Sequence, residues 1–333
     1  MPLIEHTANG LFCQAGDFYI DPWRSVDRAV VTHAHSDHAR RGAHSYLVPI
    51  DGVGLLKHRL GDDIKVTGIP YRTGIEINGV KVSLHPAGHV LGSCMVRVEH
   101  RDEVWVVSGD YKAQHDKTCQ PMEPVLCHVF ITESTFGLPI YRWKPSHLIF
   151  EDIHRWWQSN REENRCSIIF GYSLGKSQRI LAELQPLGPI GLHGAIASLI
   201  PAYEAAGVKF PAWEKVDTSN KEQVSRFKKG GMILAPPSAN GTPWVGKWGD
   251  VATASASGWM TIRGPKRRAN VDAGFVLSDH VDWTGIMETV QATGAQRIGI
   301  THGYVNTLVK YFHEKGVDAF ALETRFQGDA AEE

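Results

Sequence analysis

The chain has 333 residues, of which 42% are hydrophobic, and its formal net charge is −1 at pH 7. This length accommodates one large domain or two ordinary ones with a real core, as in a globular protein. A balanced charge excludes overall basicity as an argument for nucleic-acid binding, so any such binding must depend on local patches.

The cysteines and the N-terminal segment bear on the compartment. Cys13, Cys94, Cys119, Cys127 and Cys166 are odd in number and form no C-x-x-C pair, which predicts reduced thiols rather than a redox or structural zinc motif. The first residues, MPLIEHTANGLF, lack the basic flank and apolar centre of a signal peptide, and no run of about 18 apolar residues occurs. We therefore expect a cytoplasmic protein with no membrane span.

Short runs rich in valine and isoleucine predict buried strands at residues 29–31, 80–84, 104–107, 129–131, 167–170, 274–277 and 297–300. Helical periodicity predicts helices at residues 148–158, 176–185, 196–206, 221–227, 283–293 and 304–315. Strands dominate up to about residue 139, and strands alternate with helices from about 140 to 269. Residues 236–249 are expected to form a long ordered loop. The mixture predicts an α/β fold.

Side chains with ligand or acid–base chemistry follow the C-terminal ends of predicted strands. They are His33, His35, Asp37 and His38 in THAHSDH, His89 in PAGHVLGS, Asp110 in SGDY, Glu133 in TES, His280 in SDH and His302 in THG. In open α/β sheets ligands bind in the crevice outside such strand ends. Segments far apart in the sequence can therefore present these groups to one point.

The THAHSDH motif predicts metal binding. Residues two apart in an extended chain face the same side, so His33 and His35 can reach one ion, and after a turn Asp37 and His38 can reach a second. Imidazoles and carboxylates are the usual zinc ligands, and a carboxylate such as Asp110 can bridge two ions. Two ions about 3.5–4 Å apart bind a hydroxide between them, aimed at phosphorus or a carbonyl carbon. Such a nitrogen and oxygen ligand set accepts zinc, manganese or iron.

Two further groups suit acid–base chemistry. His280 could donate a proton to a leaving oxygen, and Glu133 could hold that imidazole and raise its pKa. Both motifs are short, so a structural role is a stronger alternative here than for THAHSDH. His302 is either a ligand of the second metal or a phosphate contact.

The stretch GYSLGKSQRI at residues 171–180 is similar to the phosphate loop of nucleotide hydrolases. Three residues separate its two glycines where that loop needs four, which argues against an ATPase. Lys176 and Arg179 could hold a nucleic-acid phosphate at this loop-to-helix junction, and helix capping by Ser173 is an equal alternative.

The run RGPKRR contains four cations, Arg263, Lys266, Arg267 and Arg268. It could hold a polynucleotide backbone, and a solvated charged loop is an equal alternative. Most of the ten tryptophans are expected in the core, with one or two stacking on bases.

Six motifs in chain order, THAHSDH, PAGHVLGS, SGDY, ITESTFG, FVLSDH and ITHG, resemble those of the β-CASP branch of the metallo-β-lactamase superfamily, whose nucleases act on DNA or RNA. The likeness covers nearly the whole chain. GYSLGKSQ, PPSANGTPW and SASGWM resemble more narrowly the bacterial DNA-ligase-associated exonucleases, which are also named messenger-RNA 3′-end processing factors.

The resemblance implies a metallo-β-lactamase αββα sandwich from residues 1 to about 140 and about 270 to 333, with a β-CASP α/β cap domain at 141–269 inserted into it. It implies one zinc on His33, His35 and His89, a second on Asp37, His38 and His302, and Asp110 bridging the two. Glu133 and His280 would form the acid–base pair, with Asp37 also catalytic. Asp21 in YIDPW would orient a metal ligand from behind.

We therefore expect a di-metal hydrolase that cleaves nucleic acid, foremost a DNA exonuclease in DNA repair. Its cofactors would be two divalent ions, zinc ahead of manganese, and a DNA ligase or a helicase would be its candidate protein partner. Artemis-like DNA nucleases of the family generally carry an aliphatic residue at the place of His302, whereas RNA-processing members carry histidine, so an RNA 3′-end processing nuclease is the alternative. A small-molecule metallo-hydrolase of the same superfamily and a metal-free scaffold are two further alternatives.

Overall fold

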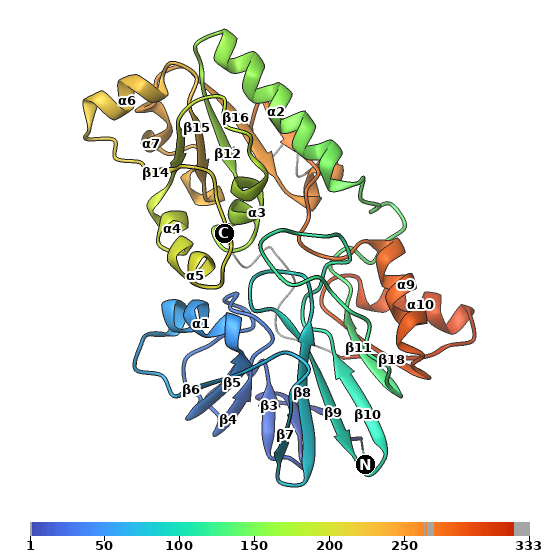
Figure 1. Cartoon of the computed structure of the whole chain (residues 1–333). Helices are drawn as coiled ribbons and strands as arrows, with labels where there is room; N and C mark the ends of the chain where they lie inside the picture. The colour runs from blue at the N-terminus through green and yellow to red at the C-terminus, as the bar shows by residue number, and fades with distance from the viewer. Residues whose placement is uncertain (1, 263, 265–269, 323–333) are drawn as a thin grey trace. The chain divides into compact units, whose positions relative to one another are not determined.

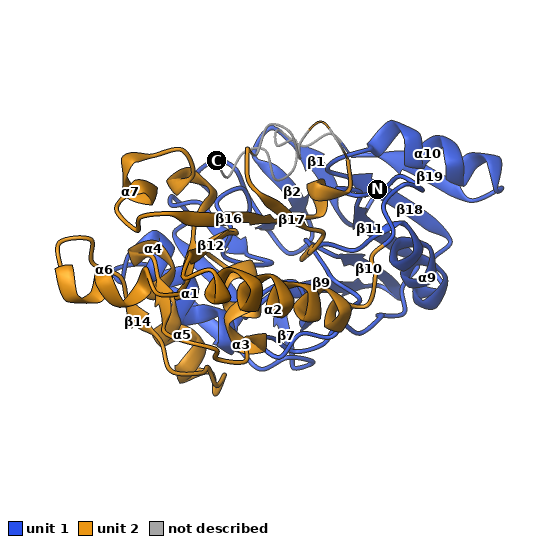
Figure 2. Cartoon of the chain, turned by 90° about the horizontal axis from the view of Figure 1, so that it is seen from above, with its two compact units in different colours: residues 1–142, 280–332 blue, residues 143–279, 333 orange. Residues whose placement is uncertain are grey.

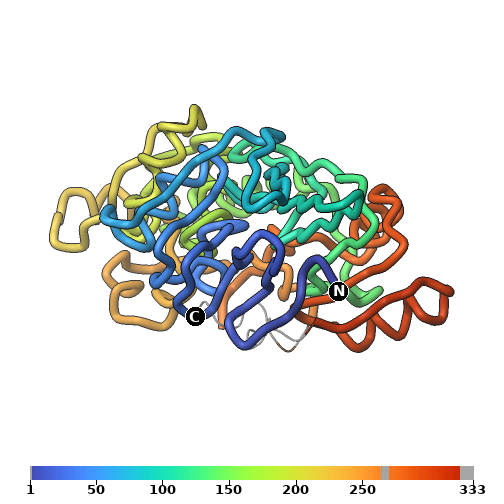
Figure 3. Tube along the Cα trace, turned by 90° about the horizontal axis from the view of Figure 1, so that it is seen from below, coloured from blue at the N-terminus to red at the C-terminus, as the bar shows by residue number. Residues whose placement is uncertain are grey.

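The computed structural model describes residues 2–262, 264 and 270–322. The chain divides into two compact units (Figure 2): unit 1 comprises Met1–Arg142 and His280–Glu332, and unit 2 comprises Trp143–Asp279 with Glu333. Figure 3 traces the chain from its blue N-terminal part to its red C-terminal part, and residues 2–142 and 280–322 of these two parts belong to unit 1. Within the described residues, no helix is long and apolar enough to span a bilayer.

The first sheet of unit 1 has the order β1-β2-β3-β4-β5-β6. Its strands are β1 (Glu5–Thr7), β2 (Gly10–Cys13), β3 (Phe18–Ile20), β4 (Arg28–Val30), β5 (Ser45–Pro49) and β6 (Val66–Ile69). The first three strands are antiparallel, and β3 to β6 are parallel. The C-terminal ends of β3 and β4 therefore lie side by side.

The second sheet of unit 1 has the order β19-β18-β11-β10-β9-β8-β7 (Figure 1). Its strands are β7 (Gly74–Ile77), β8 (Val80–Pro86), β9 (Cys94–His100), β10 (Glu103–Val107), β11 (Val129–Glu133), β18 (Arg297–Thr301) and β19 (Asp318–Ala321). Neighbours from β7 to β10 are antiparallel, whereas β10, β11, β18 and β19 are parallel. Since β9 opposes both β8 and β10, the strands β8, β10, β11 and β18 all end at one edge of the sheet.

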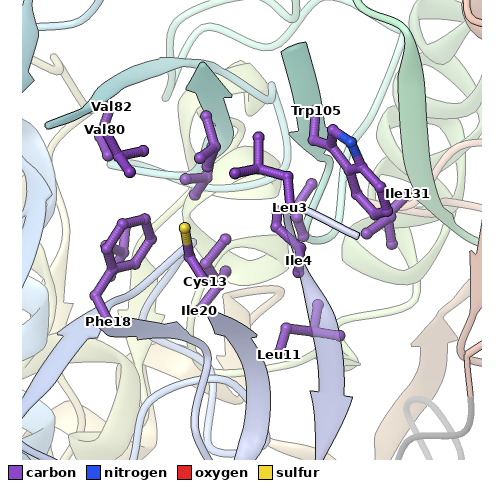
Figure 4. Packing of buried hydrophobic residues seen from close by; sticks show 14 of the residues in the cluster. Leu3, Ile4, Leu11, Cys13, Phe18, Ile20, Val80, Val82, Trp105 and Ile131 are labelled. Atoms are coloured by element: carbon purple, nitrogen blue, oxygen red, sulfur yellow. The ribbon is translucent and has the colours of Figure 1, made fainter. Parts of the chain in front are cut away.

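The two sheets of unit 1 face each other across a shared apolar core (Figure 4). Phe18 and Ile20 from β3 belong to the same buried cluster as Val80 and Val82 from β8. Residues two apart in each strand point inward because side chains alternate across a strand. Burial of each such side chain stabilises the fold by about 1.5–3 kcal/mol relative to leaving it in water.

Helices cover the outer faces of both sheets in unit 1. The helix α1 (Val53–Leu60) buries Leu56 and Leu60 in a cluster with residues of β4 and β5. The helices α9 (Trp283–Thr293) and α10 (Val305–Glu314) bury Ile286 and Leu308 in a cluster with residues of β10, β11 and β18. Unit 1 thus has four layers, in the order helix, sheet, sheet, helix.

Unit 2 contains a parallel sheet of order β14-β13-β15-β12-β16-β17. Its strands are β12 (Cys166–Phe170), β13 (Ile190–Leu192), β14 (Glu214–Lys215), β15 (Met232–Ala235), β16 (Val251–Ala256) and β17 (Ala273–Phe275). Parallel strands are normally covered on both faces, and two separate buried clusters lie against this sheet. The α/β prediction is therefore confirmed.

One cluster of unit 2 contains residues of the helices α2 (Ser146–Glu162), α3 (Lys176–Glu183), α4 (Gly194–Ala197) and α5 (Ile200–Ala205). The other contains residues of α6 (Lys221–Phe227) and aromatic side chains in and after α7 (Pro243–Gly246). Short 3₁₀ helices occur at Ile50–Gly52, Pro237–Ala239 and Gly258–Thr261.

The prediction of one continuous helix at residues 196–206 is wrong. The chain forms α4 and α5 instead, with a break between Ala197 and Ile200. Pro201 lies in the first turn of α5, where its missing N–H costs no helical hydrogen bond and its fixed φ favours a new helix start. The predicted loop at 236–249 is ordered, and it contains a 3₁₀ helix and α7.

Gly92 allows two backbone segments of unit 1 to approach closely. Its φ is +73°, and a Cβ at this position would lie 2.2 Å from Gly52 Cα. We expect Gly92→Ala to lower the free energy of unfolding by about 2–4 kcal/mol, because overpacking and a left-handed φ both carry a cost. Gly79 is the matched control, since its φ is +78° and no other described heavy atom lies within 4 Å of the Cβ position. Urea denaturation should show a smaller loss for Gly79→Ala, and equal losses would contradict the steric argument.

Candidate metal centre

The histidine-rich loop follows β4 and turns sharply at His35. The carbonyl of His35 accepts hydrogen bonds from the amides of His38 at 3.2 Å and Ala39 at 2.8 Å. This turn brings His38 back beside His33, so that their ring centroids are 4.2 Å apart. The imidazoles are buried although they lie in a loop, with 3% of His33 and 3% of His38 exposed.

The second sheet of unit 1 supplies four more of the predicted residues from one edge. His89 follows β8, Asp110 follows β10, Glu133 is the last residue of β11 and His302 follows β18. Because these four strands end at the same edge, the side chains converge although 213 positions, from 89 to 302, separate the first from the last. His280 lies between β17 and α9.

A first group of ligand atoms comes from His33, His35, His89 and Asp110, all of which are buried. Nδ1 of His35 lies 3.0 Å from Nε2 of His33 and 3.0 Å from Nε2 of His89. Oδ2 of Asp110 lies 3.5 Å from His33 Nε2 and 3.8 Å from His89 Nε2. Atoms bound about 2.0–2.2 Å from one tetrahedral ion are roughly 3.3–3.6 Å apart, and the four distances here, from 3.0 to 3.8 Å, lie on both sides of that range. The group is therefore close to the spacing of a metal site.

A second group comes from His33, Asp37 and His38. Nε2 of His38 lies 3.5 Å from Asp37 Oδ2 and 3.4 Å from Asp110 Oδ2. This nitrogen is buried and has no hydrogen-bond partner among the described residues. A buried polar atom without a partner is costly, and a cation held between the imidazole and the carboxylates would satisfy it. The residues present therefore fit a divalent metal ion.

His302 is beside these groups and belongs to neither of them. Its ring stacks on that of His38, with centroids 5.2 Å apart and planes inclined by 17°. Its φ is +52°, a left-handed value, and its carbonyl accepts a hydrogen bond from Ser134 Oγ. Both sequence-based interpretations of His302, ligand and phosphate contact, stay predictions.

Burial and the neighbouring charges set the protonation of the site. Burial, with repulsion from His38, holds the pKa of His33 well below its usual range, which favours the neutral imidazole that binds metals. Burial also lowers the pKa of His38, but the carboxylates of Asp110, Asp37 and Asp21 outweigh it and raise that pKa well above the usual range. In an apo protein a proton on His38 thus takes the place that a cation can occupy.

Asp21 supports His38 from the side opposite the ligand atoms. Its Oδ2 accepts a hydrogen bond from His38 Nδ1 at 2.7 Å, and its Oδ1 accepts one from the Thr32 amide at 2.7 Å. With Nδ1 donating to a carboxylate, Nε2 is the nitrogen left to bind a metal. This geometry suits the orienting role predicted for Asp21.

We expect Asp21→Asn to weaken zinc binding by about 10- to 100-fold, because an amide can donate to His38 Nδ1 and favour the wrong tautomer. Titration of metal-free protein with zinc against a chromophoric chelator measures this change. Asp17→Asn is the control, since Asp17 pairs with Arg28 at 3.2 Å and its side chain is 62% exposed. Equal zinc affinities for both variants would contradict the role of Asp21.

Glu133 and His280 form a buried carboxylate–imidazole pair. His280 Nδ1 lies 2.9 Å from Glu133 Oε2 and 3.0 Å from Oε1, and the Tyr111 amide donates to Oε1 at 2.9 Å. Burial raises the pKa of Glu133, and the coulombic effect of His280 opposes that shift. His280 Nδ1 is also 4.0 Å from Asp110 Oδ2, so the pair adjoins the ligand groups. The arrangement can hold a proton at the other ring nitrogen of His280.

Lys176 and Arg179 are buried in unit 2 and do not fit the predicted phosphate contact. Lys176 Nζ lies 2.7 Å from Asp279 Oδ2, and Arg179 donates to Asp279 Oδ1 at 3.1 Å and to the Ser278 carbonyl at 2.7 Å. Their exposed fractions are 3% and 1%, so the cations serve an internal ion pair. Gln178, whose side chain accepts from the Gly175 amide at 2.7 Å, provides the helix capping that was assigned to Ser173.

The other predicted nucleic-acid contacts, Arg263, Lys266, Arg267 and Arg268, lie outside the described residues. Sequence reasoning also missed Lys112 and Asp116, which form a buried ion pair directly behind His89. Their spacing of four residues was the one available signal, and an i, i+4 pair is more often a solvated pair on a helix surface.

The chain is similar to curated proteins over different lengths, although no family model matches it. It is 28% identical over 326 residues to a "Probable DNA ligase" of Opitutus terrae, covering 97% of this chain and 31% of that protein. It is 32% identical over 124 residues to "Cleavage and polyadenylation specificity factor subunit 3" of Dictyostelium discoideum, covering 36% of this chain and 16% of that protein. It is 37% identical over 75 residues to "Endoribonuclease ysh1" of Schizosaccharomyces pombe, covering 22% and 10%.

These similarities combine with the buried histidine and aspartate groups, which lie in the motifs that characterise one family. In these features the chain resembles the metallo-β-lactamase/β-CASP family. The chain spans about a third or less of the length of the curated relatives it matches.

A solved structure resembles this chain in fold. It is a protein of unknown function from Enterococcus faecalis V583, with a TM-score of 0.61 and 12% identity, and the match covers 91% of this chain and 80% of that one. At this identity the similarity shows the fold alone. The similarities to curated proteins and the candidate site together indicate a metal-dependent hydrolase.

Proposed function

We propose that the chain is a two-metal phosphodiesterase that cleaves nucleic acid, foremost a DNA exonuclease that acts in DNA repair. The observation that carries this proposal is the position of Asp110. Its Oδ2 lies 3.4–3.8 Å from the Nε2 atoms of His38, His33 and His89, and so adjoins both ligand groups. One carboxylate oxygen shared by two groups is the arrangement that a pair of ions needs.

The two compact units support the proposed domain organisation. The four-layered unit 1 suits a metallo-β-lactamase sandwich, and the parallel sheet of unit 2 suits an inserted β-CASP domain. The chain enters unit 2 after Arg142 and leaves it after Asp279. The strand β17 pairs with β16, so the return to unit 1 comes after the position near residue 270 implied by the resemblance.

Two divalent ions are proposed as cofactors, zinc ahead of manganese. His33, His35 and His89 would hold one ion, Asp37, His38 and His302 the other, and Asp110 would lie between them. When bound, such ions neutralise the charge that develops on phosphoryl oxygens.

The chain's own residues would then position and transfer the proton. Glu133 holds His280 through Nδ1, so the other ring nitrogen of His280 is the one that can protonate the leaving oxygen. The carboxylate of Glu133 stabilises the protonated ring and is itself fixed by the Tyr111 amide. Asp21 fixes the His38 ring in the same way.

DNA is favoured over RNA because the relative named as a DNA ligase matches 97% of the chain, while those named as endoribonucleases or as a polyadenylation factor match 22–37%. The same relative supports a DNA ligase, ahead of a helicase, as the protein partner. An RNA 3′-end processing nuclease is the second candidate, and His302 beside the His38 ring is the observation that favours it.

A time course on end-labelled DNA and RNA with added zinc or manganese tests the proposal. We expect label to be released from DNA ends, and we expect a chelator to abolish this release. A panel of thioesters and lactones run in parallel separates this activity from that of a small-molecule hydrolase. Hydrolysis of the panel with no digestion of either oligonucleotide would overturn the nuclease proposal.

A further inference from the structure

Lys112 is a buried cation behind the metal centre that the proposed chemistry does not use. Its side chain is 1% exposed, and Nζ lies 2.6 Å from Oδ2 of Asp116, whose side chain is 3% exposed. Removal of an ammonium group from water is unfavourable unless it is paired and hydrogen-bonded. The buried Lys112–Asp116 pair is therefore an energetically costly and rigid connection beside the candidate metal centre.

The contacts of Lys112 reach the loop that carries His89. Its ammonium donates to the His89 carbonyl at 3.2 Å, and its backbone amide donates to the Ala87 carbonyl at 3.0 Å. Lys112 thus donates hydrogen bonds to Ala87 and His89, the residues on either side of Gly88. Gly88 has a φ of +73°, and a Cβ there would lie 2.6 Å from the Lys112 carbonyl oxygen, so the two segments are in close contact.

The same residue belongs to the loop that carries Asp110, because it follows Asp110 by two positions. Asp116 is itself held in place, since its Oδ1 accepts from the Thr118 amide at 2.8 Å and from Thr118 Oγ1 at 2.7 Å. The amide of His89 is fixed separately by Ser93 Oγ at 3.1 Å. The Lys112 ammonium therefore provides a direct contact between the His89 backbone and the Asp110 loop.

We propose that Lys112 is a positioning residue that sets the spacing of the His89 and Asp110 ligand loops, with Asp116 as its anchor. The inference rests on the proposed metal centre and adds a residue that touches neither metal nor substrate. His89 Nε2 and Asp110 Oδ2 are 3.8 Å apart, and a metal ion tolerates only a few tenths of an ångström of error in such distances. Loss of the ammonium should therefore weaken metal binding in a protein that is still folded.

Zinc titration of the metal-free full chain, in competition with a chromophoric chelator, tests the role of Lys112. Lys112→Met keeps an unbranched side chain of similar length and removes the positive charge. We expect this variant to bind zinc about 10- to 100-fold more weakly than the wild type. Asp116→Asn keeps the volume and weakens the anchor, so it should shift affinity in the same direction by a smaller factor. It also provides the readout if Lys112→Met does not fold.

Lys176→Met is the matched control, since it breaks another buried lysine–aspartate pair, at 2.7 Å, in unit 2. It should lower the unfolding temperature and leave zinc affinity unchanged. If the Lys112 and Asp116 variants lose stability yet bind zinc as the wild type does, the ion pair is merely structural and the inference is overturned. If the wild type binds no zinc, the proposed metal centre fails first and the inference fails with it.

Discussion

Replacing Asp37 and His38 together by alanine is expected to lower the rate of oligonucleotide cleavage by at least about a thousandfold, since a catalytic ion supplies several kcal/mol of charge stabilisation. Both side chains belong to the second ligand group, and His38 Nε2 has no hydrogen-bond partner among the described residues. The first group, with His35 and His89, is untouched by this change.

Metal analysis supplies the control for that experiment. The double variant should retain about one equivalent of zinc where the wild type holds about two, because only one of the two ligand groups is removed. Circular dichroism should show both proteins folded. If the variant releases label as fast as the wild type, these residues do not form the catalytic centre.

His280→Ala should lower the rate on oligonucleotides by about 10²–10⁴-fold, the usual contribution of a positioned general acid. His280, Glu133 and Asp110 also lie within ligand spacing of one another, but His280 is outside the two groups proposed to hold metal and its Nδ1 is bonded to Glu133. Zinc content should therefore not change. A Glu133→Gln, His280→Ala double variant should be about as slow as His280→Ala alone, since residues that act as a unit are not additive.

A nitrophenyl phosphodiester distinguishes acid catalysis from a structural effect of His280. Nitrophenolate leaves without a proton, so the variant should lose much less activity on this substrate than on an oligonucleotide. If His280→Ala lowers the cleavage rate by the same factor on both substrates, His280 does not protonate the leaving group.

Much of the candidate site was predicted from the expectation that ligand residues follow the C-terminal ends of strands. This expectation depends only on local sequence patterns. THAHSDH is dense in ligands, and His89 and Asp110 each follow a recognisable run of valines. Their convergence requires β8 and β10 to run in the same direction, and the antiparallel β9 between them makes this so. That strand, CMVRVEH, was not predicted, although Val96 and Val98 alternate with Arg97 and Glu99 in the period-two pattern of a half-buried strand.

The ion pairs could not be predicted from local patterns. Lys176 and Asp279 are 103 positions apart, and cations at the start of a helix are ordinarily solvated. The strand β13 also escaped prediction, because it consists of three residues, IGL, with a glycine in the middle. Fold class and candidate metal ligands are thus visible in short segments, whereas the buried charges become visible only when distant segments are placed together.

Anomalous diffraction from crystals of the zinc-loaded protein tests the central claim most directly. Two zinc peaks about 3.5–4 Å apart are predicted, with Asp110 between them. A single peak, or two peaks too distant to share the Asp110 carboxylate, would contradict a two-metal centre.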